Sequence, residues 1–389
     1  MKEILILTEL FFPEEYVIND LALSLKKKGY SVTVVTRNPS YPDGIIFPGY
    51  KNSFFNKYFY KEIKIIGLKF LNNYSKNIFF KGLNHCLYVF QSILFALFNR
   101  NKFDKILFYQ TGPLTNGICL FFFSNKTPKS IWIQDLWPET INIFTSNKIV
   151  NIIALKVSKI IYSRISTFFI SCEGFSQSLT SRFNVDKRNI LYFPNWSLNN
   201  FDIPFKVNFD CNNIKILYAG NVGKFQELDK VLDSFVKAEC NNLYFEILGS
   251  GINLKSLKSK YEDHPNIIFH NKVSIKKTEL YFNKTDFLFL SLIKNVLFEV
   301  MMPSKVQTYL TTNRPIISVV SGYTNDFIKK HKLGYTADFS TDSSLIELFL
   351  KISKIKQLDY LNFKSNFNVL ENHFKKQNII NSFINYYEK

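Results

Sequence analysis

Lys305 lies at the predicted start of a helix, a place where a protein can bind a phosphorylated ligand. It lies in the run Leu297–Ile317, shortly after the apolar strand predicted at 287–292, and Pro303 suits the first turn of a predicted helix. Free N–H groups at a helix start favour an anion beside Ser304 and Lys305. We therefore predict a phosphate site here, with an ordinary crossover helix bearing a solvated lysine as the alternative.

A second lysine, Lys224, closes the turn Gly220-Asn221-Val222-Gly223-Lys224 after a strand predicted at 215–219. The glycines Gly220 and Gly223 would let backbone N–H groups approach a phosphate beside Asn221, and Lys224 would neutralise it. A tight turn between strand and helix is the alternative. Neither G-x-G-x-x-G nor a Walker loop occurs, which argues against dinucleotide oxidoreductases and NTPases.

Carboxylates follow predicted strands in both halves of the chain. Glu299 is expected on a loop after the strand at 287–292, and Asp135 directly follows a strand at 130–133. Strand ends of a parallel sheet converge on one edge, where ligands bind. Asp135 could act there or cap a helix predicted at 135–143. The sequence leaves both roles open.

These residues must be positioned by alternating strands and helices. The predicted strands are continuous apolar runs, such as those at 4–7 and 106–108, as expected for parallel sheets covered by helices on both faces. Helices are predicted from a cap at Asn19 or Asp20 to residue 28, at 115–123 and at 175–183. The pattern breaks at a Pro- and Asn-rich stretch near 193–204 and then restarts. We predict an α/β protein with two doubly wound halves and a long amphipathic helix pattern at 363–387.

Composition narrows the class of protein. The 389 residues suit two domains, and 46% hydrophobic residues support real cores. No C-x-x-C pair, regular histidine spacing or D-x-D triplet occurs, so we expect no metal and no cofactor. The scattered cysteines fit a cytoplasmic protein. The net charge of +18 attracts nucleic acid, an anionic membrane or phosphorylated substrates.

The segment Tyr50–Phe103 interleaves lysines with phenylalanine and tyrosine and contains almost no acid. Such a segment can lie on an anionic membrane surface. A core-facing helix with a solvated basic side is the alternative. No apolar run is long enough to span a bilayer.

Several motifs, in order along nearly the whole chain, resemble those of family 4 glycosyltransferases with the GT-B fold, in the branch that builds bacterial O-antigen and capsule. They are E-E-Y-V-I-N-D-L-A (Glu14–Ala22), N-P-S-Y-P-D-G-I-I-F-P-G-Y (Asn38–Tyr50), Q-D-L-W-P-E (Gln134–Glu139), S-C-E-G-F (Ser171–Phe175), F-P-N-W (Phe193–Trp196), Y-A-G-N-V-G (Tyr218–Gly223), L-F-E (Leu297–Glu299) and P-S-K (Pro303–Lys305).

The resemblance implies two Rossmann-like domains facing each other across a cleft. An acceptor domain would cover 1–193, a linker 194–212 and a donor domain 213–362, with a C-terminal helix at 363–389 packing back toward the first domain. The implied reaction is metal-independent, retaining transfer of a sugar from a nucleotide diphosphate sugar, expected to be a UDP-sugar, to a lipid-linked saccharide. The protein would be cytoplasmic and peripheral on the inner face of the cell membrane.

The resemblance also implies roles for single residues. Asp135 would serve the acceptor and Glu299 the sugar hydroxyls. The donor would contact Gly220, Asn221, Gly223, Lys224, Glu299, Pro303, Ser304, Lys305 and Thr308. The acceptor side would be formed by Glu14, Asn19, Tyr41, Asp135 and Trp137.

The chain departs from the family pattern at three places. Where many relatives carry a second glutamate for the nucleotide ribose, this chain has Thr308, so Gln307 or Thr308 would have to replace it. Asn313 takes the place of a glycine, and Pro13-Glu14-Glu15 replaces a glycine-rich loop. A nucleotide-sugar epimerase of the same plan is the enzymatic alternative. A basic nucleic-acid-binding protein is the other, although no reading motif is present and we expect no nucleic-acid partner.

Overall fold

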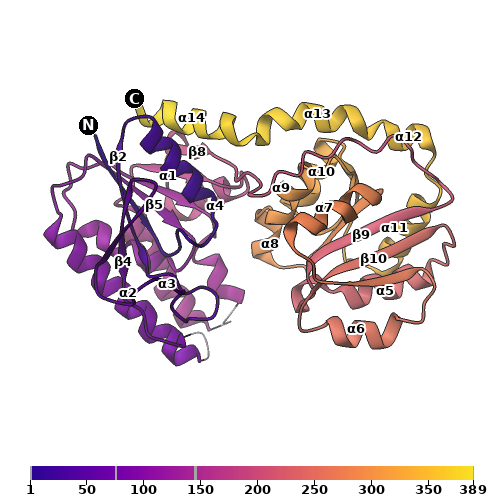
Figure 1. Cartoon of the computed structure of the whole chain (residues 1–389), viewed down its shortest axis with the longest axis horizontal. Helices are drawn as coiled ribbons and strands as arrows, with labels where there is room; N and C mark the ends of the chain where they lie inside the picture. The colour runs from indigo at the N-terminus through magenta and orange to yellow at the C-terminus, as the bar shows by residue number, and fades with distance from the viewer. Residues whose placement is uncertain (1, 75–76, 144–146, 389) are drawn as a thin grey trace. The chain divides into compact units, whose positions relative to one another are not determined.

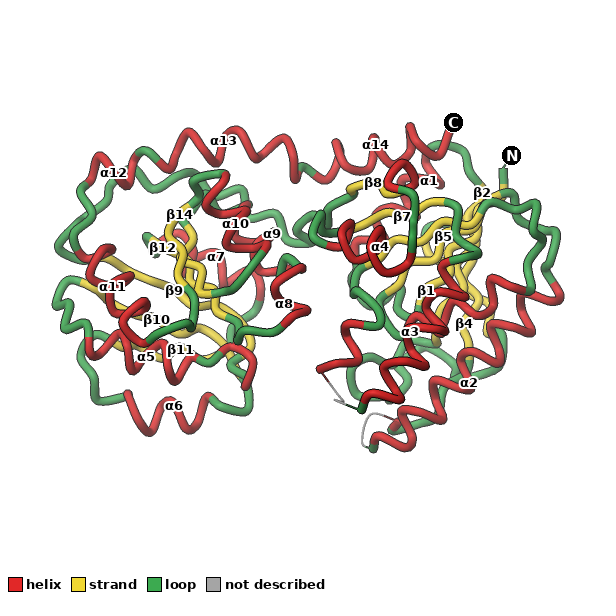
Figure 2. The backbone as a smooth tube through the Cα atoms, turned by 180° about the vertical axis from the view of Figure 1, so that it is seen from behind, coloured by secondary structure: helices red, strands yellow, loops and turns green. Residues whose placement is uncertain are grey.

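The computed structural model describes residues 2–74, 77–143 and 147–388, which form two compact units (Figure 1). Unit 1 comprises residues 1–194 and 380–389, and unit 2 comprises residues 195–379. Each unit contains a sheet with helices around it (Figure 2). The prediction of two doubly wound α/β domains is confirmed.

Unit 1 is built on an eight-stranded sheet in the order β3-β4-β2-β1-β5-β6-β7-β8. All neighbours run parallel except β3, which pairs antiparallel with β4 at the edge. Because β1 lies between β2 and β5, the winding direction reverses there, which is where ligands bind in such sheets. The strands are β1 (Glu3–Thr8), β2 (Ser31–Arg37), β3 (Asn56–Tyr60), β4 (Ile63–Leu68), β5 (Lys105–Gln110), β6 (Lys129–Ile133), β7 (Thr167–Ile170) and β8 (Ile190–Tyr192).

The helices of unit 1 differ from the predicted ones at three places. The helix predicted at 135–143 is only a 3₁₀ helix over Glu139–Ile143, and the preceding crossover, predicted at 115–123, is also 3₁₀, over Leu114–Phe121. The first helix begins after Tyr16 rather than at Asn19 or Asp20, because Asn19 turns inward. The helices are α1 (Val17–Lys27), α2 (Ile78–Phe98), η2 (Leu114–Phe121), η3 (Glu139–Ile143), α3 (Lys148–Tyr162), α4 (Phe175–Phe183) and η4 (Lys187–Asn189).

Unit 2 contains a wholly parallel six-stranded sheet in the order β11-β10-β9-β12-β13-β14. Here the winding reverses at β9, between β10 and β12. Its strands are β9 (Ile214–Asn221), β10 (Leu243–Ser250), β11 (Ile267–Asn271), β12 (Phe287–Ser291), β13 (Ile316–Val319) and β14 (Gly334–Ala337). Its helices are η5 (Lys224–Gln226), α5 (Leu228–Lys237), α6 (Leu254–Tyr261), α7 (Ile275–Lys284), α8 (Val296–Val300), α9 (Ser304–Leu310), α10 (Tyr323–Lys330), α11 (Asp342–Ser353), α12 (Gln357–Leu361) and α13 (Phe363–Phe374).

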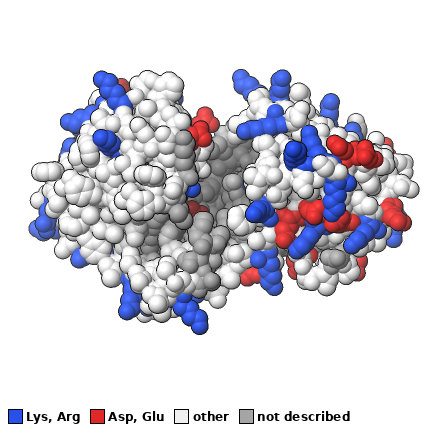
Figure 3. All heavy atoms as spheres, turned by 90° about the horizontal axis from the view of Figure 1, so that it is seen from below, with Lys and Arg blue, Asp and Glu red and all other residues white. Residues whose placement is uncertain are grey.

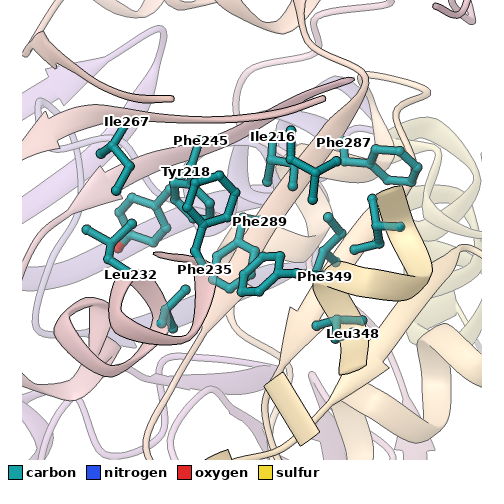
Figure 4. Close-up of a cluster of buried hydrophobic side chains, with 14 of the residues drawn as sticks. Ile216, Tyr218, Leu232, Phe235, Phe245, Ile267, Phe287, Phe289, Leu348 and Phe349 are labelled. Carbon is teal, nitrogen blue, oxygen red and sulfur yellow. The ribbon is translucent and has the colours of Figure 1, made fainter. Parts of the chain in front are cut away.

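An aromatic core fixes the sheet of unit 2 against its helices (Figure 4). Phe245 of β10 and Phe289 of β12, the strands on either side of β9, pack edge to face with ring centroids 5.0 Å apart. Phe235 of α5 packs against Phe349 of α11. Such pairs add to the energy of burial. The carboxyl ends of β9 and β10 are thereby held in place beside each other.

The predicted linker at 194–212 is not a free connection. Its residues belong to unit 2, where Phe209 stacks on Tyr360 at 4.2 Å and Ile203 is buried. The Arg314 guanidinium donates to the carbonyl of Pro204 at 2.8 Å. Apolar residues within a Pro- and Asn-rich segment therefore bind it to the domain that follows.

The single C-terminal helix predicted from residue 363 is two helices, because Lys375 takes an extended conformation. The first, α13, belongs to unit 2, whereas α14 (Lys376–Glu388) crosses to unit 1 from Ile380 onward. There Phe383 packs against Trp132, with centroids 6.0 Å apart, and the Tyr387 hydroxyl lies 2.7 Å from Ser130 Oγ.

Candidate functional site

A cavity of about 480 Å³ opens at the carboxyl ends of β9 and β10 in unit 2. This is the point where the winding of the sheet reverses, so the cavity lies where such folds bind ligands. It is lined by Asn199, Phe201, Ala219, Gly220, Asn221, Leu248, Gly249, Ser250, Lys272, Val273, Ile275, Thr278, Phe282, Ser304, Lys305, Thr308 and Tyr309. Two of these residues are lysines, and none of the described residues in the lining is acidic. The lining therefore favours an anionic ligand.

Lys305 is the strongest chemical feature of the cavity. Its ammonium nitrogen lies 3.8 Å from the centroid of the Tyr218 ring and is buried, with no hydrogen-bond partner among the described residues. Burial lowers the pKa of Lys305 to about 7. A buried cation without a partner costs free energy, and a bound phosphate would supply the missing acceptor.

Gly220 makes room for this lysine. Its φ of +138° is a conformation that residues with a side chain rarely adopt, and a Cβ there would lie 2.6 Å from Lys305 Cε. The glycine at the end of β9 is thus needed for the path of the lysine side chain. This use differs from the predicted phosphate-binding turn, because β9 continues through Asn221.

Of the nine predicted donor residues, five line the cavity: Gly220, Asn221, Ser304, Lys305 and Thr308. The two candidates for the missing glutamate differ in their placement. Gln307 is buried, with its amide nitrogen placed to donate to the carbonyls of Pro303 and Ser304, whereas Thr308 is one of the residues that line the cavity.

The other four predicted donor residues, Gly223, Lys224, Glu299 and Pro303, are not among the lining residues. Lys224 is exposed at the start of η5, and Gly223 N–H donates to Gln226 Oε1 at 2.9 Å. Pro303 is the N-cap of α9 rather than its first residue. Glu299 lies in the short helix α8 and not on a loop, because the Asn295 side chain caps that helix.

Lys224 and Glu299 nevertheless come from adjoining segments. Phe225 of η5 packs edge to face on Phe298 of α8, with centroids 5.8 Å apart, and Ile293 N–H donates to the Phe225 carbonyl at 2.8 Å. Gly322 approaches the Glu299 backbone so closely that a Cβ would lie 2.2 Å from its carbonyl oxygen. Lys224 and Glu299 therefore lie on segments that pack against each other at this edge of the sheet.

Twelve of the lining residues were not among the predicted site residues, and they include Asn199, Phe201 and Lys272. Lys272 directly follows β11, and the rule that ligands bind beyond strand ends would have found it. Asn199 and Phe201 carry no such signal, because they come from the segment predicted as a linker.

In unit 1, Asp135 lies beyond the end of β6 and is partly buried. Burial raises the pKa of its carboxyl to about 6. The next helical residue is Glu139, so Asp135 is too far from a helix start to serve as the N-cap. A strand-end carboxylate whose ionisation is made costly by burial is a functional candidate.

Glu14, Asn19 and Tyr41 are brought together by the loop at 38–50. One Glu14 carboxylate oxygen accepts the backbone N–H groups of Ser40 at 3.1 Å and Tyr41 at 3.2 Å. Asn19 Nδ2 donates to the Glu14 carbonyl at 2.7 Å. Glu14 thus anchors the loop, and the exposed Tyr41 is carried on it.

Trp137 is half-buried, and its carbonyl accepts the Tyr162 hydroxyl at 3.4 Å.

A charged pair that was not predicted from the sequence lies at the strand ends of unit 1. Arg37 donates to Glu9 at 2.7 Å, and Asn116 Nδ2 lies 3.3 Å from the other Glu9 oxygen. The strand ends of unit 1 therefore form a polar edge at the reversal of its sheet.

Within the described residues, no group of three or more His, Cys, Asp or Glu side chains is placed to hold a metal ion.

The sequence matches no protein-family model and none of the curated proteins. The fold is similar to solved structures of glycosyltransferases with the GT-B fold. Sucrose-phosphate synthase from Thermosynechococcus elongatus is 11% identical with a TM-score of 0.67, and the match covers 100% of this chain and 98% of that one. HepE from Anabaena, in complex with UDP and glucose, is 10% identical with a TM-score of 0.67 over 100% of both chains. The lipopolysaccharide outer core galactosyltransferase WaaB is 14% identical with a TM-score of 0.63, over 98% and 99% of the two chains. At this identity the likeness establishes the GT-B fold.

Proposed function

We propose that the protein is a retaining, metal-independent glycosyltransferase that moves a sugar from a UDP-sugar to a lipid-linked saccharide. The observation that carries the proposal is the cavity of unit 2. Among the described residues its lining contains two lysines and no acid, and the buried ammonium of Lys305 has no hydrogen-bond partner. A diphosphate supplies the charge and the acceptors that this arrangement lacks. The GT-B fold supports the assignment, and one structure of similar fold contains UDP and glucose.

The donor contacts follow from the lining. Lys305 and Lys272 neutralise the diphosphate, and the side chains of Asn221, Ser304 and Thr308 supply polar partners around the nucleotide. When the bond to the sugar breaks, negative charge develops on the leaving phosphate. Fixed cations stabilise this charge without a metal ion.

Glu299 and Lys224 act at the sugar end of the donor. They stand on adjoining segments beside the cavity, where Glu299 accepts hydrogen bonds from sugar hydroxyls and Lys224 adds charge next to the diphosphate. Both side chains are free to adjust, since Lys224 is exposed and Glu299 half-buried.

The acceptor binds at the polar strand-end edge of unit 1. Asp135 orients the acceptor hydroxyl or removes its proton, a role suited to a carboxylate whose pKa burial has raised to about 6. Tyr41 and Trp137 offer aromatic faces to the saccharide, while Glu14 and Asn19 position the loop that carries Tyr41.

We further propose that the product belongs to a bacterial surface polysaccharide, O-antigen or capsule, as the family 4 motifs suggest. Among the proteins of similar fold, WaaB is described as a lipopolysaccharide outer core galactosyltransferase. A lipid-linked acceptor would place the enzyme at the cytoplasmic face of the cell membrane.

Incubation with a panel of UDP-sugars, with and without lipid-linked saccharides, tests this function. The proposal predicts UDP release that depends on both substrates and a product with retained anomeric configuration. Conversion of the sugar without an acceptor would indicate an epimerase instead. Binding of nucleic acid with no turnover of any sugar nucleotide would refute the proposal.

A further inference from the structure

Helix α2 in unit 1 has the opposite polarity to an ordinary surface helix. Its polar side chains face the protein: Asn84 accepts from the Leu71 N–H at 2.9 Å, and Gln91 exchanges hydrogen bonds of 2.9 and 2.8 Å with the backbone of Lys69. Both are buried. Its outer side is apolar, with Phe79 66% and Phe90 56% exposed. A helix facing water alone shows the reverse pattern.

The outer row of α2 is continuous. Phe79, Leu83, Phe90 and Leu97 are all exposed and recur at intervals of four and seven residues, which places them along one stripe. At about 1.5 Å per residue, this stripe runs along a helix of roughly 30 Å. The exposed apolar residues of α2 thus form a continuous row and are not isolated exposed side chains.

Helix α3 presents a similar surface. Ile149, Ile153 and Ile160 are 68%, 56% and 56% exposed and share one side, while the polar Ser158 is buried. Both helices pack against η2. On α2 His85 Nε2 lies 2.6 Å from Thr115 Oγ1 of η2, and Ile161 of α3 lies beside Gly117 of the same helix. We call the exposed apolar rows of the two helices the α2–α3 face.

The charge around this face has one sign. The sequence contains no Asp or Glu from residue 63 to 103 or from 140 to 172, whereas Lys81 lies on α2 and Lys148, Lys156 and Lys159 lie on α3. These four lysines are exposed. Seen from below, unit 1 shows mostly uncharged atoms with lysine and arginine at the margins (Figure 3).

We propose that the α2–α3 face docks on an anionic lipid bilayer, with its phenylalanine, leucine and isoleucine side chains in the interfacial layer and its lysines on the lipid phosphates. Apolar contact and charge complementarity act together at such a surface. A second copy of the chain fits less well, because a symmetric contact would bring the same lysines together. Among the helices of the described residues, none is long and apolar enough to span the membrane.

The biological use of the surface rests on the proposed function, since a lipid-linked acceptor is found only in the membrane. Docking through unit 1 keeps the acceptor edge of the same domain near the bilayer. The binding itself needs no substrate and is tested without one.

Co-sedimentation of the full-length protein with vesicles tests the proposal. Binding is expected to vesicles containing phosphatidylglycerol, and to fall at least tenfold with pure phosphatidylcholine or in 0.5 M salt, because screening weakens the lysine contacts. The variant Phe79→Ser/Ile153→Ser removes one exposed side chain from each helix and should lower binding at least tenfold. The control Ile252→Ser/Leu280→Ser changes residues of unit 2 that are 75% and 60% exposed and should bind like wild type.

Two further measurements keep the outcome decisive. In the variant Phe90→Trp, brominated lipids should quench the fluorescence of the introduced tryptophan. Unquenched fluorescence of this residue would overturn the proposal. Binding that is equal for both double variants, or a dimer in solution that Phe79→Ser/Ile153→Ser dissociates, would also overturn it. Transfer to a water-soluble acceptor analogue should survive in Phe79→Ser/Ile153→Ser. A wild-type protein that transfers the sugar but does not bind vesicles would refute the docking surface and leave the proposed function standing.

Discussion

Proton uptake on nucleotide binding is the most specific consequence of the Lys305 environment. Burial lowers the pKa of this lysine to about 7 in the empty cavity, so most molecules carry a neutral amine at pH 8. A diphosphate beside the nitrogen favours the charged form and raises the pKa again. Binding of UDP should therefore take up a proton.

The magnitude follows from the titration. With a pKa of about 7, roughly nine-tenths of the molecules must gain a proton at pH 8, which gives an uptake of about 0.9 proton per UDP. UDP contributes little, since a second phosphate pKa of about 6 leaves it fully ionised at pH 8. The affinity for UDP should fall about tenfold for each pH unit above 7 until the pKa of the complex is reached.

Calorimetry in buffers of different ionisation enthalpy measures this uptake directly. Lys305→Met keeps a flexible side chain over Tyr218 but has no proton to gain, so its uptake should be near zero and its affinity lower. Lys224→Met removes an exposed lysine and should retain the uptake. No uptake by wild type, or equal uptake by wild type and Lys305→Met, would refute the role of Lys305.

The same pKa makes a prediction about stability. In the unfolded chain the lysine has an ordinary pKa of about 10.5, so between pH 7 and 10.5 the unfolded state binds more protons than the folded state. The free energy of unfolding of the empty protein should therefore rise with pH in this window, by at most about 5 kcal/mol. Lys305→Met should remove this dependence in urea titrations.

Three further substitutions test other parts of the account. Asp135→Asn should slow transfer by about 10²–10⁴-fold with UDP affinity unchanged. Burial raises the pKa of Asp135 to about 6, so its negative charge lowers the stability of the protein at pH 7. The variant should therefore melt at the same or a higher temperature. Normal transfer by the variant would remove Asp135 from the mechanism. Gly220→Ala would place a Cβ 2.6 Å from Lys305 Cε, and calorimetry should show UDP affinity at least about tenfold weaker; wild-type affinity would contradict this. Tyr387→Phe removes the contact of 2.7 Å with Ser130 Oγ and should lower the free energy of unfolding by about 0.5–1.5 kcal/mol without changing UDP affinity, and an unchanged stability would show that the contact contributes nothing.

The fold could be predicted from the sequence because its strands are continuous apolar runs. The runs at 4–7 and 287–292 correspond to β1 and β12 within two residues, since a strand buried on both faces admits few other residue types. Helix 175–183 was predicted with its observed bounds. The 3₁₀ helices were not, because i→i+3 and i→i+4 turns share almost the same apolar spacing.

The site could be predicted only where it follows a strand end or a helix start. Gly220 was found at the end of a predicted strand, Ser304 and Lys305 were found at the start of a predicted helix, and all three line the cavity. No local pattern tells which side chain near a turn points inward, so Lys224 was predicted to bind phosphate like Lys305, although it is exposed. Phe201 was missed because its contribution depends on how a loop folds back on its own domain, which no local pattern reports.

The central claim is that the cavity of unit 2 holds the diphosphate of a UDP-sugar. A crystal structure of the protein with UDP tests it most directly. The account predicts phosphate oxygens within hydrogen-bond distance of Lys305 Nζ, with the nucleotide among the residues that line the cavity. UDP bound elsewhere, with Lys305 Nζ still lacking a partner, would contradict it.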